Sequence, residues 1–413
     1  MKKPHYAWVI CAACTLLMFC VMGIGATSFS VFNPYITAAG HLTNTQLSVV
    51  STVRSVTIAL TMFYSVWLYG KLGPRLCALL ACLAEALGFL MFAFSGGFLA
   101  YCVSIGVIGA AYGVGAMMLA AVIIPPWFES HRALALGISA AGSGVAAVIV
   151  PPLTTSIIAG TSLRAAFLLD ALFVAVCGVL IFAVVRAKPQ EMGLQPLRAP
   201  ESKSAEAAAK KADAAAPHSR RAVLFMCVGY ALFAGMAGPG TAFTTMLFST
   251  SGDGDMTTAV LLSAYGAALT VGKLCFGQLV DRFGTRRVSL LFFGIVTVSG
   301  VLLCFPRFAP AAWAGSALLG FGIPLSTVGV PLFAADAAEP GGYTRALKAI
   351  NFTFMVSSLV FYPLPGLLAD SLGSYVPSYA IFTLLTVAGA ALVLLAYRAP
   401  APSEVTAPGG EQK

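Results

Sequence analysis

KLCFGQLVDRFGTRR, residues 273–287, places a cation inside an apolar stretch and follows it with a basic turn. Lys273 lies within the run Thr257–Val280, whose other side chains are all uncharged. A charged side chain in such a run is costly unless it faces a partner or a water-filled cavity. The turn DRFGTRR has one acidic and three basic side chains, and basic turns between apolar segments are typical of cytoplasmic loops. The stretch therefore predicts a membrane-spanning helix that ends at the cytoplasmic side.

The composition places the chain among integral membrane proteins. Of its 413 residues, 59% are hydrophobic and 9% are charged, against about 25% charged in soluble domains. The longest polar segment, residues 186–221, has no aromatic side chain and cannot form a soluble catalytic domain. No nucleophile–base pair, metal cluster or phosphate loop stands out, so we expect no enzyme, cofactor or metal site. The net charge of +9 is concentrated in the loops, which argues against nucleic acid as a partner.

Twelve apolar stretches are long enough to cross the roughly 30 Å hydrocarbon core of a bilayer. They are Ala7–Phe32, Leu47–Tyr69, Pro74–Phe94, Phe98–Ile124, Ala133–Ile158, Leu163–Val185, Ala222–Phe248, Thr257–Val280, Val288–Phe305, Ala311–Ala335, Leu347–Ala369 and Tyr375–Tyr397. The first is too long for the core of a signal peptide, so we expect an uncleaved helix. The sequence thus predicts an all-α membrane protein with twelve transmembrane helices.

The positions of Lys and Arg predict the orientation of these spans. With the N-terminus inside, 20 of the 24 Lys and Arg residues fall on the inner side. Arg164 and Arg307 fall on the outer side, and Arg54 and Lys273 lie within spans. Because cytoplasmic loops are enriched in positive charge, we expect a multi-pass protein of the plasma (cytoplasmic) membrane with both termini in the cytoplasm.

The two halves of the chain resemble each other. GIGATSF, residues 23–29, is echoed by GPGTAF, residues 238–243, and KLGPR, residues 71–75, is echoed by RFGTR, residues 282–286. Two parallel six-helix repeats with a substrate site between them form a known transporter architecture. The predicted division is an N-terminal six-helix bundle, a cytoplasmic linker, a C-terminal six-helix bundle and a cytoplasmic tail, at residues 1–185, 186–221, 222–397 and 398–413.

Three motifs carry a resemblance to a known family. GQLVDRFGTRR, residues 277–287, fits the pattern G-x-L-x-D-R-x-G-R-R, and with twelve spans and a central loop the chain resembles the major facilitator superfamily. WFESHRALALGISAAG, residues 127–142, and GLLADSLGSY, residues 366–375, resemble the branch that holds monocarboxylate transporters and oxalate/formate antiporters. The motif at residues 127–142 has a basic side chain, Arg132, at one of the three positions where that branch usually carries one. The resemblance implies two pseudo-symmetric six-helix bundles and an eighth-span cation, Lys273, that binds a carboxylate.

Lys273 is the first candidate for substrate binding. Its helical face continues through Gly266, Thr270 and Gly277, which are small or polar and suit close packing or a cavity rather than lipid. Lys273 lies about 12 Å along the helix axis from Asp281, close to the middle of the membrane. The alternative is that Lys273 snorkels to the cytoplasmic surface or pairs with Asp281.

Arg54 is the second buried cation, on a polar face with Ser51, Thr61 and Ser65. This face should point to the interior, where Arg54 could contact substrate. Alternatively, Glu85 in the third span neutralises Arg54 as a structural ion pair, or competes for Arg54 and releases it as a proton or substrate arrives. Glu85 is also the candidate group for proton coupling.

Other polar residues fill supporting roles in this prediction. Those within spans could orient the substrate, although packing or helix capping explains each at least as well: Thr27, Ser28, Tyr230, Thr241, Tyr265 and Asn351. The turn after the eighth span is the predicted gate, whose acidic residue forms charge-assisted bonds to a neighbouring helix end until the halves rock. Its predicted members are Gly277, Asp281, Arg282, Gly284, Arg286 and Arg287.

Two buried cations on opposite halves, with few buried carboxylates to match, favour an anionic substrate. Leu359 stands where dicarboxylate-handling members of the resembling branch carry a Lys, which favours monocarboxylates. We therefore expect a monomeric secondary transporter for small organic anions that works in the bilayer by alternating access, as a proton symporter or an anion exchanger. Two alternatives stay open: export of a neutral or amphipathic metabolite, and a sensor that binds a ligand on the same fold without moving it.

Overall fold

The structure, a computed structural model, describes residues 5–129, 131–197, 220–337 and 343–397. The N-terminal half, residues 5–197, contains α1 (Tyr6–Leu17), η1 (Met18–Thr27), η2 (Phe29–Phe32), α2 (Asn33–Ala39), α3 (Asn44–Leu72), α4 (Pro74–Phe94), α5 (Phe98–Gly115), α6 (Met117–Ile123), α7 (Arg132–Gly160), α8 (Leu163–Val184) and η3 (Pro189–Met192). The C-terminal half, residues 220–397, contains α10 (Arg220–Gly235), η4 (Met236–Gly240), α11 (Thr244–Ser251), α12 (Asp255–Phe283), α13 (Thr285–Leu303), α14 (Ala309–Gly322), α15 (Pro324–Thr327), α16 (Gly329–Ala337), α17 (Tyr343–Phe361), α18 (Leu364–Leu372) and α19 (Val376–Ala396).

The predicted fold class is confirmed. In the described part of the chain, 11 helical stretches are long and apolar enough to cross a membrane, and they correspond to all but one of the predicted spans. The remaining stretch, predicted at Ala311–Ala335, is divided among α14, α15 and α16 near Pro324 and Gly329. None of these three helices reaches spanning length alone, because proline lacks the N–H that would continue the helix.

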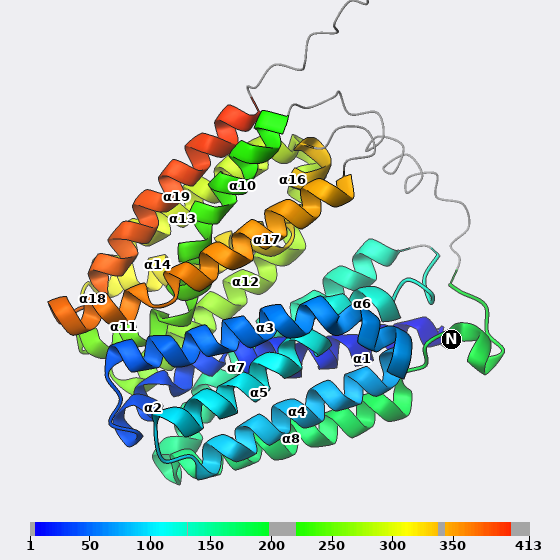
Figure 1. Cartoon of the computed structure of the whole chain (residues 1–413), viewed down its shortest axis with the longest axis horizontal. Coiled ribbons are helices and arrows are strands. Elements are labelled where there is room, and N and C mark those ends of the chain that lie inside the picture. The colour runs from blue at the N-terminus through cyan, green and yellow to red at the C-terminus, as the bar shows by residue number, and fades with distance from the viewer. Residues whose placement is uncertain (1–4, 130, 198–219, 338–342, 398–413) are drawn as a thin grey trace, which may run out of the picture.

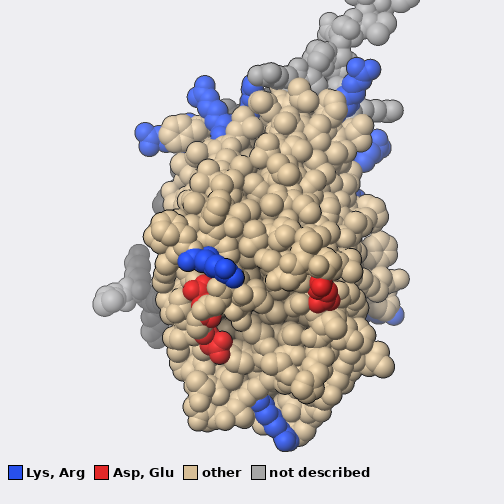
Figure 2. Space-filling view, turned by 90° about the vertical axis from the view of Figure 1, so that its left-hand side faces the viewer, with Lys and Arg blue, Asp and Glu red and all other residues tan. Residues whose placement is uncertain are grey.

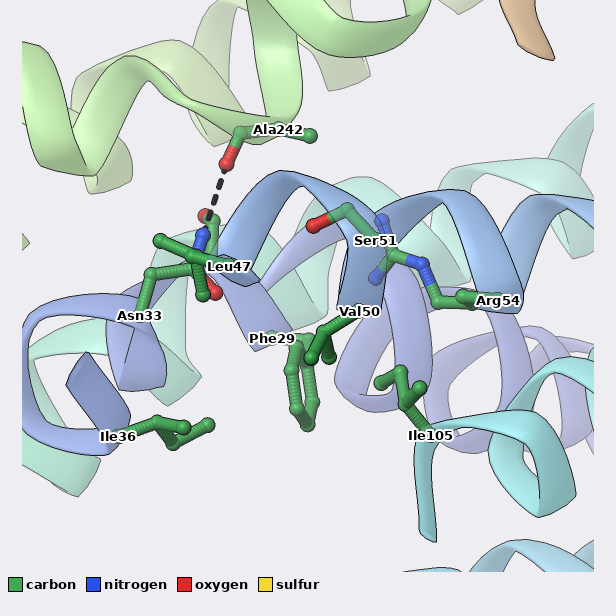
Figure 3. A pocket seen from close by; sticks show the side chains of 10 residues that line it. Phe29, Asn33, Ile36, Leu47, Val50, Ser51, Arg54, Ile105 and Ala242 are labelled. Atoms are coloured by element: carbon green, nitrogen blue, oxygen red, sulfur yellow. Dashed lines mark hydrogen bonds between the residues drawn. The ribbon is translucent and has the colours of Figure 1, made fainter. Parts of the chain in front are cut away.

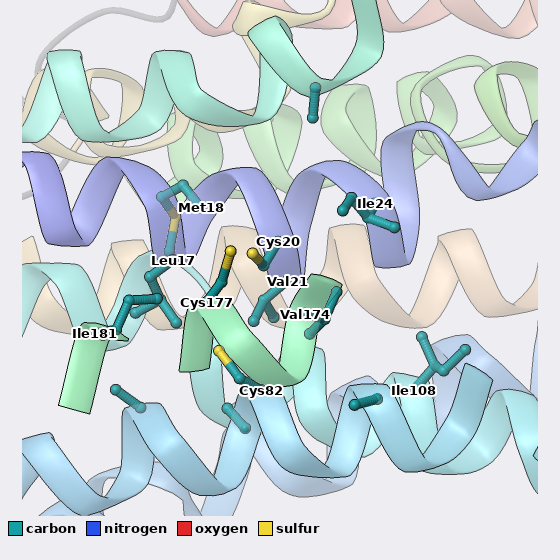
Figure 4. Close-up of a cluster of buried hydrophobic side chains, with 14 of the residues drawn as sticks. Leu17, Met18, Cys20, Val21, Ile24, Cys82, Ile108, Val174, Cys177 and Ile181 are labelled. Carbon is teal, nitrogen blue, oxygen red and sulfur yellow. The ribbon is translucent and has the colours of Figure 1, made fainter. Parts of the chain in front are cut away.

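Buried side chains form two hydrophobic clusters, one mainly in each half. In the N-terminal cluster, η1 packs against α4 and α8, where Cys20, Cys82 and Cys177 lie close together (Figure 4). The C-terminal cluster includes the edge-to-face contact of Tyr230 with Phe233. Among the described residues, each half therefore has its own hydrophobic core.

Figure 1 shows that the two halves meet at one end of the molecule and diverge toward the other. We call the end that carries the connections 40–43 and 373–375 the closed end. There α18 lies against α3, and α11 lies against α2. The opposite end, which carries the turns at Gly73 and Gly284, is called the open end. Toward it the C-terminal helices rise away from the N-terminal helices.

The sequence repeats between the halves adopt matching local structures. α3 and α12 each contain 29 residues and end at a glycine, Gly73 with φ 79° and ψ 152° and Gly284 with φ 82° and ψ 151°. A positive φ is costly for a residue with a Cβ atom, which explains glycine at both turns. The glycine-bearing segments of the first and seventh spans both form π-helix, in η1 and η4. The boundaries of the predicted bundles stay a prediction, and residues 198–219 and 398–413 lie outside the described residues.

α7 and α12 approach each other closely across the two halves. A Cβ atom at Gly266 would lie 2.5 Å from the carbonyl carbon of Ala147 and 2.7 Å from the nitrogen of Val148. The Ser263 hydroxyl donates to the Val148 carbonyl oxygen at 2.7 Å. On the other helix, Gly144 abuts the Thr270 side chain. The two helices therefore meet backbone against backbone.

We expect Gly266→Ala to destabilise this arrangement. The new methyl group would meet backbone atoms that cannot rotate away, and overpacking of this kind costs about 1–3 kcal/mol. The thermal unfolding midpoint of the purified protein in detergent should fall. Gly294→Ala is the matched control, because nothing lies within 4 Å of a Cβ atom at Gly294. Equal midpoints for the two variants would contradict the close approach of α7 and α12.

Candidate functional site

Lys273 binds across the interface between the halves. Its ammonium donates to the Ser143 hydroxyl at 2.7 Å and to the Ala140 carbonyl oxygen at 3.4 Å, both on α7. The side chain is 9% exposed. No carboxylate contacts Lys273 among the side chains that the structure describes, so its partners there are neutral oxygen atoms. A cation in this setting attracts an anion more strongly than it attracts a hydroxyl group.

The predicted small and polar face of α12 is the face that packs on α7. Gly266 and Thr270 contact α7, and Lys273 follows one turn later. Around Gly277, one further turn toward the open end, nothing lies within 4 Å of a Cβ position. Lys273 therefore lies where the contact between α7 and α12 gives way to open space. The sequence suggested either close packing or a cavity for this face. Gly266 and Thr270 are closely packed, and the open space begins beyond Lys273.

Arg54 lines a small cavity beneath the closed end (Figure 3). The cavity is lined by apolar and small polar side chains from the N-terminal half and by Ala242 from the C-terminal half. Arg54 is 8% exposed, and its guanidinium carbon lies 5.8 Å from the centre of the Phe29 ring. Within the described part of the chain it forms no hydrogen bond or ion pair. The Asn33 side chain donates to the Ala242 carbonyl oxygen at 3.1 Å and joins the halves beside the cavity.

Glu85 lies inside the N-terminal half. It is 0% exposed, and its carboxylate abuts the backbone of Gly25 in η1. Neither oxygen accepts a hydrogen bond of good geometry from a described residue. The suggested ion pair of Arg54 with Glu85 is not formed in this structure. Asp170 on α8 is a carboxylate close enough for its charge to act on Glu85.

At the closed end, the Asp370 carboxylate caps a helix of the other half. Asp370 on α18 accepts hydrogen bonds from the backbone N–H groups of Asn44 and Thr45 at 3.1 and 2.8 Å and from their side chains at 2.8 and 2.6 Å. The first N–H groups of a helix lack partners within it and attract negative charge. Tyr375 adds a bond to the Asn44 side chain at 2.8 Å. Figure 2 views this end, where most of the surface is neither acidic nor basic.

We expect Asp370→Ala to loosen the closed end. The backbone N–H groups of Asn44 and Thr45 lose their acceptor, so their hydrogen exchange should accelerate roughly tenfold, as for an opening made easier by about one net hydrogen bond. Mass-spectrometric exchange on the segment 40–47, in nanodiscs, measures this. Asp253→Ala is the control, since Asp253 is another carboxylate at the closed end, and its Oδ2 has no described partner. Unchanged exchange in Asp370→Ala would show that another contact holds this end.

Most of the other predicted polar residues form hydrogen bonds within their own half. Thr27 and Thr241 donate to carbonyl oxygens of their own spans. The Tyr230 hydroxyl donates to the Leu325 carbonyl oxygen at 2.5 Å inside the C-terminal half. Asn351 is exposed and its side chain donates to Leu347 one turn away. These contacts match the packing and capping alternatives, and the substrate contacts stay a prediction.

Among the predicted polar residues, Ser28 and Tyr265 have hydroxyl groups that remain free, within the described part of the chain, to bind a ligand. Ser28 is buried beside Phe29, and its hydroxyl has no hydrogen-bond partner among the described residues. Tyr265 lies on α12 two turns before Lys273 and is 8% exposed. Both stay candidates for orienting a substrate.

The predicted gating turn lies at the open end. Arg282, Gly284, Arg286 and Arg287 are exposed there, and the Asp281 side chain lies outside the described residues. Arg286 acts on a cluster at the ends of α16 and α19, where the Tyr397 hydroxyl donates to Asp336 at 2.8 Å. Burial raises the pKa of Tyr397, Asp336 raises it further, and Arg286 opposes the shift.

Four residues in these contacts were not singled out from the sequence. Ser143 and Asp370 form hydrogen bonds between the halves. Tyr112 on α5 lies near Arg54 and near Tyr362, which directly follows α17. Ser143 could have been found as a polar residue on one face of a span. The other three could not, because their contacts are with residues distant in the sequence.

The chain is similar to known transporters over most of its length. The family profile described as the Major Facilitator Superfamily matches residues 15–259 and 252–413. Monocarboxylate transporter 12 of Mus musculus is 24% identical over 408 residues, which covers 91% of this chain and 82% of that protein. An MFS-type transporter of Gibberella moniliformis is 26% identical over 368 residues, with 86% of this chain and 82% of that protein covered.

Solved structures share the fold at low sequence identity. The nucleoside transporter NupG superposes with a TM-score of 0.73 at 12% identity, covering 95% of this chain and 100% of that chain. A bacterial homologue of the human lysosomal transporter Spinster, in an inward-facing and occupied conformation, superposes with a TM-score of 0.64 at 14% identity, covering 97% and 98% of the two chains.

Proposed function

The chain belongs to the Major Facilitator Superfamily, and we propose that it is a secondary transporter of small organic anions, above all monocarboxylates. The observation that carries the proposal is that each half supplies one buried cation, Arg54 and Lys273, without a carboxylate partner among the described side chains. Leaving such charges unpaired inside a membrane protein is costly. An anionic substrate that binds between the halves removes this cost during the transport cycle.

The lining of the Arg54 cavity supports a small and partly apolar anion. Phe29, Ile36, Leu47 and Val50 line the same cavity as Arg54 with hydrocarbon, and Ser51 adds a hydroxyl group. A carboxylate with a short aliphatic tail matches one cation in an apolar wall. The relation to monocarboxylate transporter 12 supports the same substrate class.

Alternating access is the proposed mechanism. Each half has its own core, and the hydrogen bonds that join the halves cluster between the closed end and Lys273. With both termini in the cytoplasm, as the Lys and Arg distribution favours, the open end faces inward. The transporter in this structure then releases or accepts its substrate on the cytoplasmic side. Outward opening requires loss of the Asp370 cap and closure of the open end.

Coupling is proposed to run either by proton symport or by anion exchange. Glu85 is the proposed group for symport, because it is a buried carboxyl group that lies against η1. Phe29, which begins η2 just after η1, lines the Arg54 cavity and connects Glu85 to it along the chain. Anion exchange needs no such group. We further propose a monomer in the cytoplasmic membrane with no nucleic acid or cofactor requirement.

A ligand panel scored by thermal stabilisation tests the substrate class. The purified protein should be stabilised by pyruvate, lactate or formate, since a ligand that binds the folded state raises its stability. The matching neutral amides, pyruvamide, lactamide and formamide, are the controls. Stabilisation by the amides to the same extent would favour a neutral metabolite and contradict the anion proposal.

A further inference from the structure

The bond between Lys273 and Ser143 joins the two halves at the candidate binding site itself. Lys273 belongs to α12 in the C-terminal half, and Ser143 belongs to α7 in the N-terminal half. Their atoms lie 2.7 Å apart, and Ser143 is 0% exposed. The Ala140 carbonyl oxygen, at 3.4 Å from the ammonium, is the second acceptor. The same ammonium group therefore faces the proposed substrate and holds the halves together.

A carboxylate and the Ser143 hydroxyl compete for this ammonium. The bond from the ammonium to the Ser143 hydroxyl has one ionised partner, whereas a bond to a carboxylate has two and adds the attraction between opposite charges. The Ser143 hydroxyl also donates to the Ala140 carbonyl oxygen at 3.0 Å, so it keeps a partner when Lys273 leaves. An arriving carboxylate can thus take the ammonium without leaving Ser143 unsatisfied.

This inference rests on the proposed function. We propose that Ser143 is the positioning residue that holds Lys273 in the unloaded transporter, and that the substrate carboxylate replaces Ser143 as the partner of Lys273. Loading the site then removes one bond between α7 and α12 at the point where their contact ends. A ligand shifts a conformational equilibrium only through its different affinity for the two states. The conformation in this structure contains the bond between Lys273 and Ser143, and the substrate must break that bond to bind Lys273. The substrate therefore binds this conformation less tightly than a conformation in which the bond is already absent.

The first test measures anion affinity. Ser143→Ala deletes one oxygen atom and frees Lys273 from its competitor, so the Kd for the panel anion that binds wild-type protein most tightly should fall about three- to tenfold, the effect of one net hydrogen bond. Ser139→Ala is the matched control, because the Ser139 hydroxyl bonds to Ala135 and Cys11 within the N-terminal half. A rise in Kd for Ser143→Ala would overturn the inference, since Ser143 would then assist binding.

The second test needs no ligand. Nitroxide labels attached by non-cysteine chemistry at Leu72 and Phe283, the equivalent ends of α3 and α12, report the spacing of the open end by pulsed electron paramagnetic resonance. Both side chains are exposed. Ser143→Ala and Lys273→Met should each raise the population with a short distance, and Ser139→Ala should not. Adding the panel anion to wild-type protein should produce the same shift.

The outcomes separate this inference from the proposed function. If wild-type protein binds none of the three anions, the proposed function fails, and the replacement fails with it. If the anions bind but Ser143→Ala changes neither the Kd nor the ligand-free distances, only the role of Ser143 is refuted.

Discussion

Lys273→Ala is expected to abolish anion uptake into proteoliposomes while leaving membrane insertion and folding intact. The substrate carboxylate would lose its charged partner in a buried site, and truncation of one member of such a pair costs about 2–5 kcal/mol. That corresponds to a roughly 30- to 4,000-fold loss of affinity. Folding should survive, because Lys273 bonds only to neutral oxygen atoms on α7 among the described residues.

Lys188→Ala is the matched control for this variant, since Lys188 is an exposed lysine in the loop after α8. Its uptake should equal that of the wild type, and both variants should elute as monodisperse protein in size-exclusion chromatography. Normal uptake by Lys273→Ala would remove Lys273 from the binding site.

Arg54→Ala is expected to reduce anion counterflow by about one to two orders of magnitude, through loss of a charged hydrogen bond of about 1.5–3 kcal/mol. Adding Glu85→Ala should not restore transport, because the structure forms no ion pair between the two residues. Counterflow is the right measurement here, since it proceeds without a coupling gradient and separates substrate binding from proton coupling.

The single variant Glu85→Gln completes this comparison. It should keep counterflow, because glutamine cannot take up or release a proton there but keeps the side chain in its place beside Gly25. If Arg54→Ala/Glu85→Ala transports as well as the wild type, the two residues form a structural pair in another state of the cycle, and Arg54 does not bind substrate.

Local chemistry made much of the fold predictable. Apolar length located the spans, and glycine at positions 73 and 284 marked two turns that share nearly identical backbone angles. The GIG and GPG segments, read as an internal repeat, both became π-helix. The division of the tenth span was not predicted. Pro324 and Gly329 were visible in the sequence, but hydropathy alone does not distinguish a continuous helix from a broken one.

The candidate site was less predictable, because its contacts join distant parts of the chain. The stripe Gly266, Thr270, Lys273 could be recognised as one helical face, yet its partner Ser143 lies 130 residues away. Asp370 was quoted within a family motif, and its role at the N-terminus of α3 depends on the pairing of α3 with α18. The sequence offered Glu85 as a partner for Arg54, and only the structure shows that the two form no ion pair there.

Counterflow with the purified wild-type protein shows whether it moves small carboxylates across a membrane. Proteoliposomes loaded with unlabelled pyruvate, lactate or formate are diluted into a trace of the same labelled anion. We expect transient accumulation of label that is absent in protein-free liposomes and in Lys273→Ala. If wild-type protein is thermally stabilised by one of these anions yet exchanges no label, it is a sensor on the transporter fold, and the transport claim is contradicted.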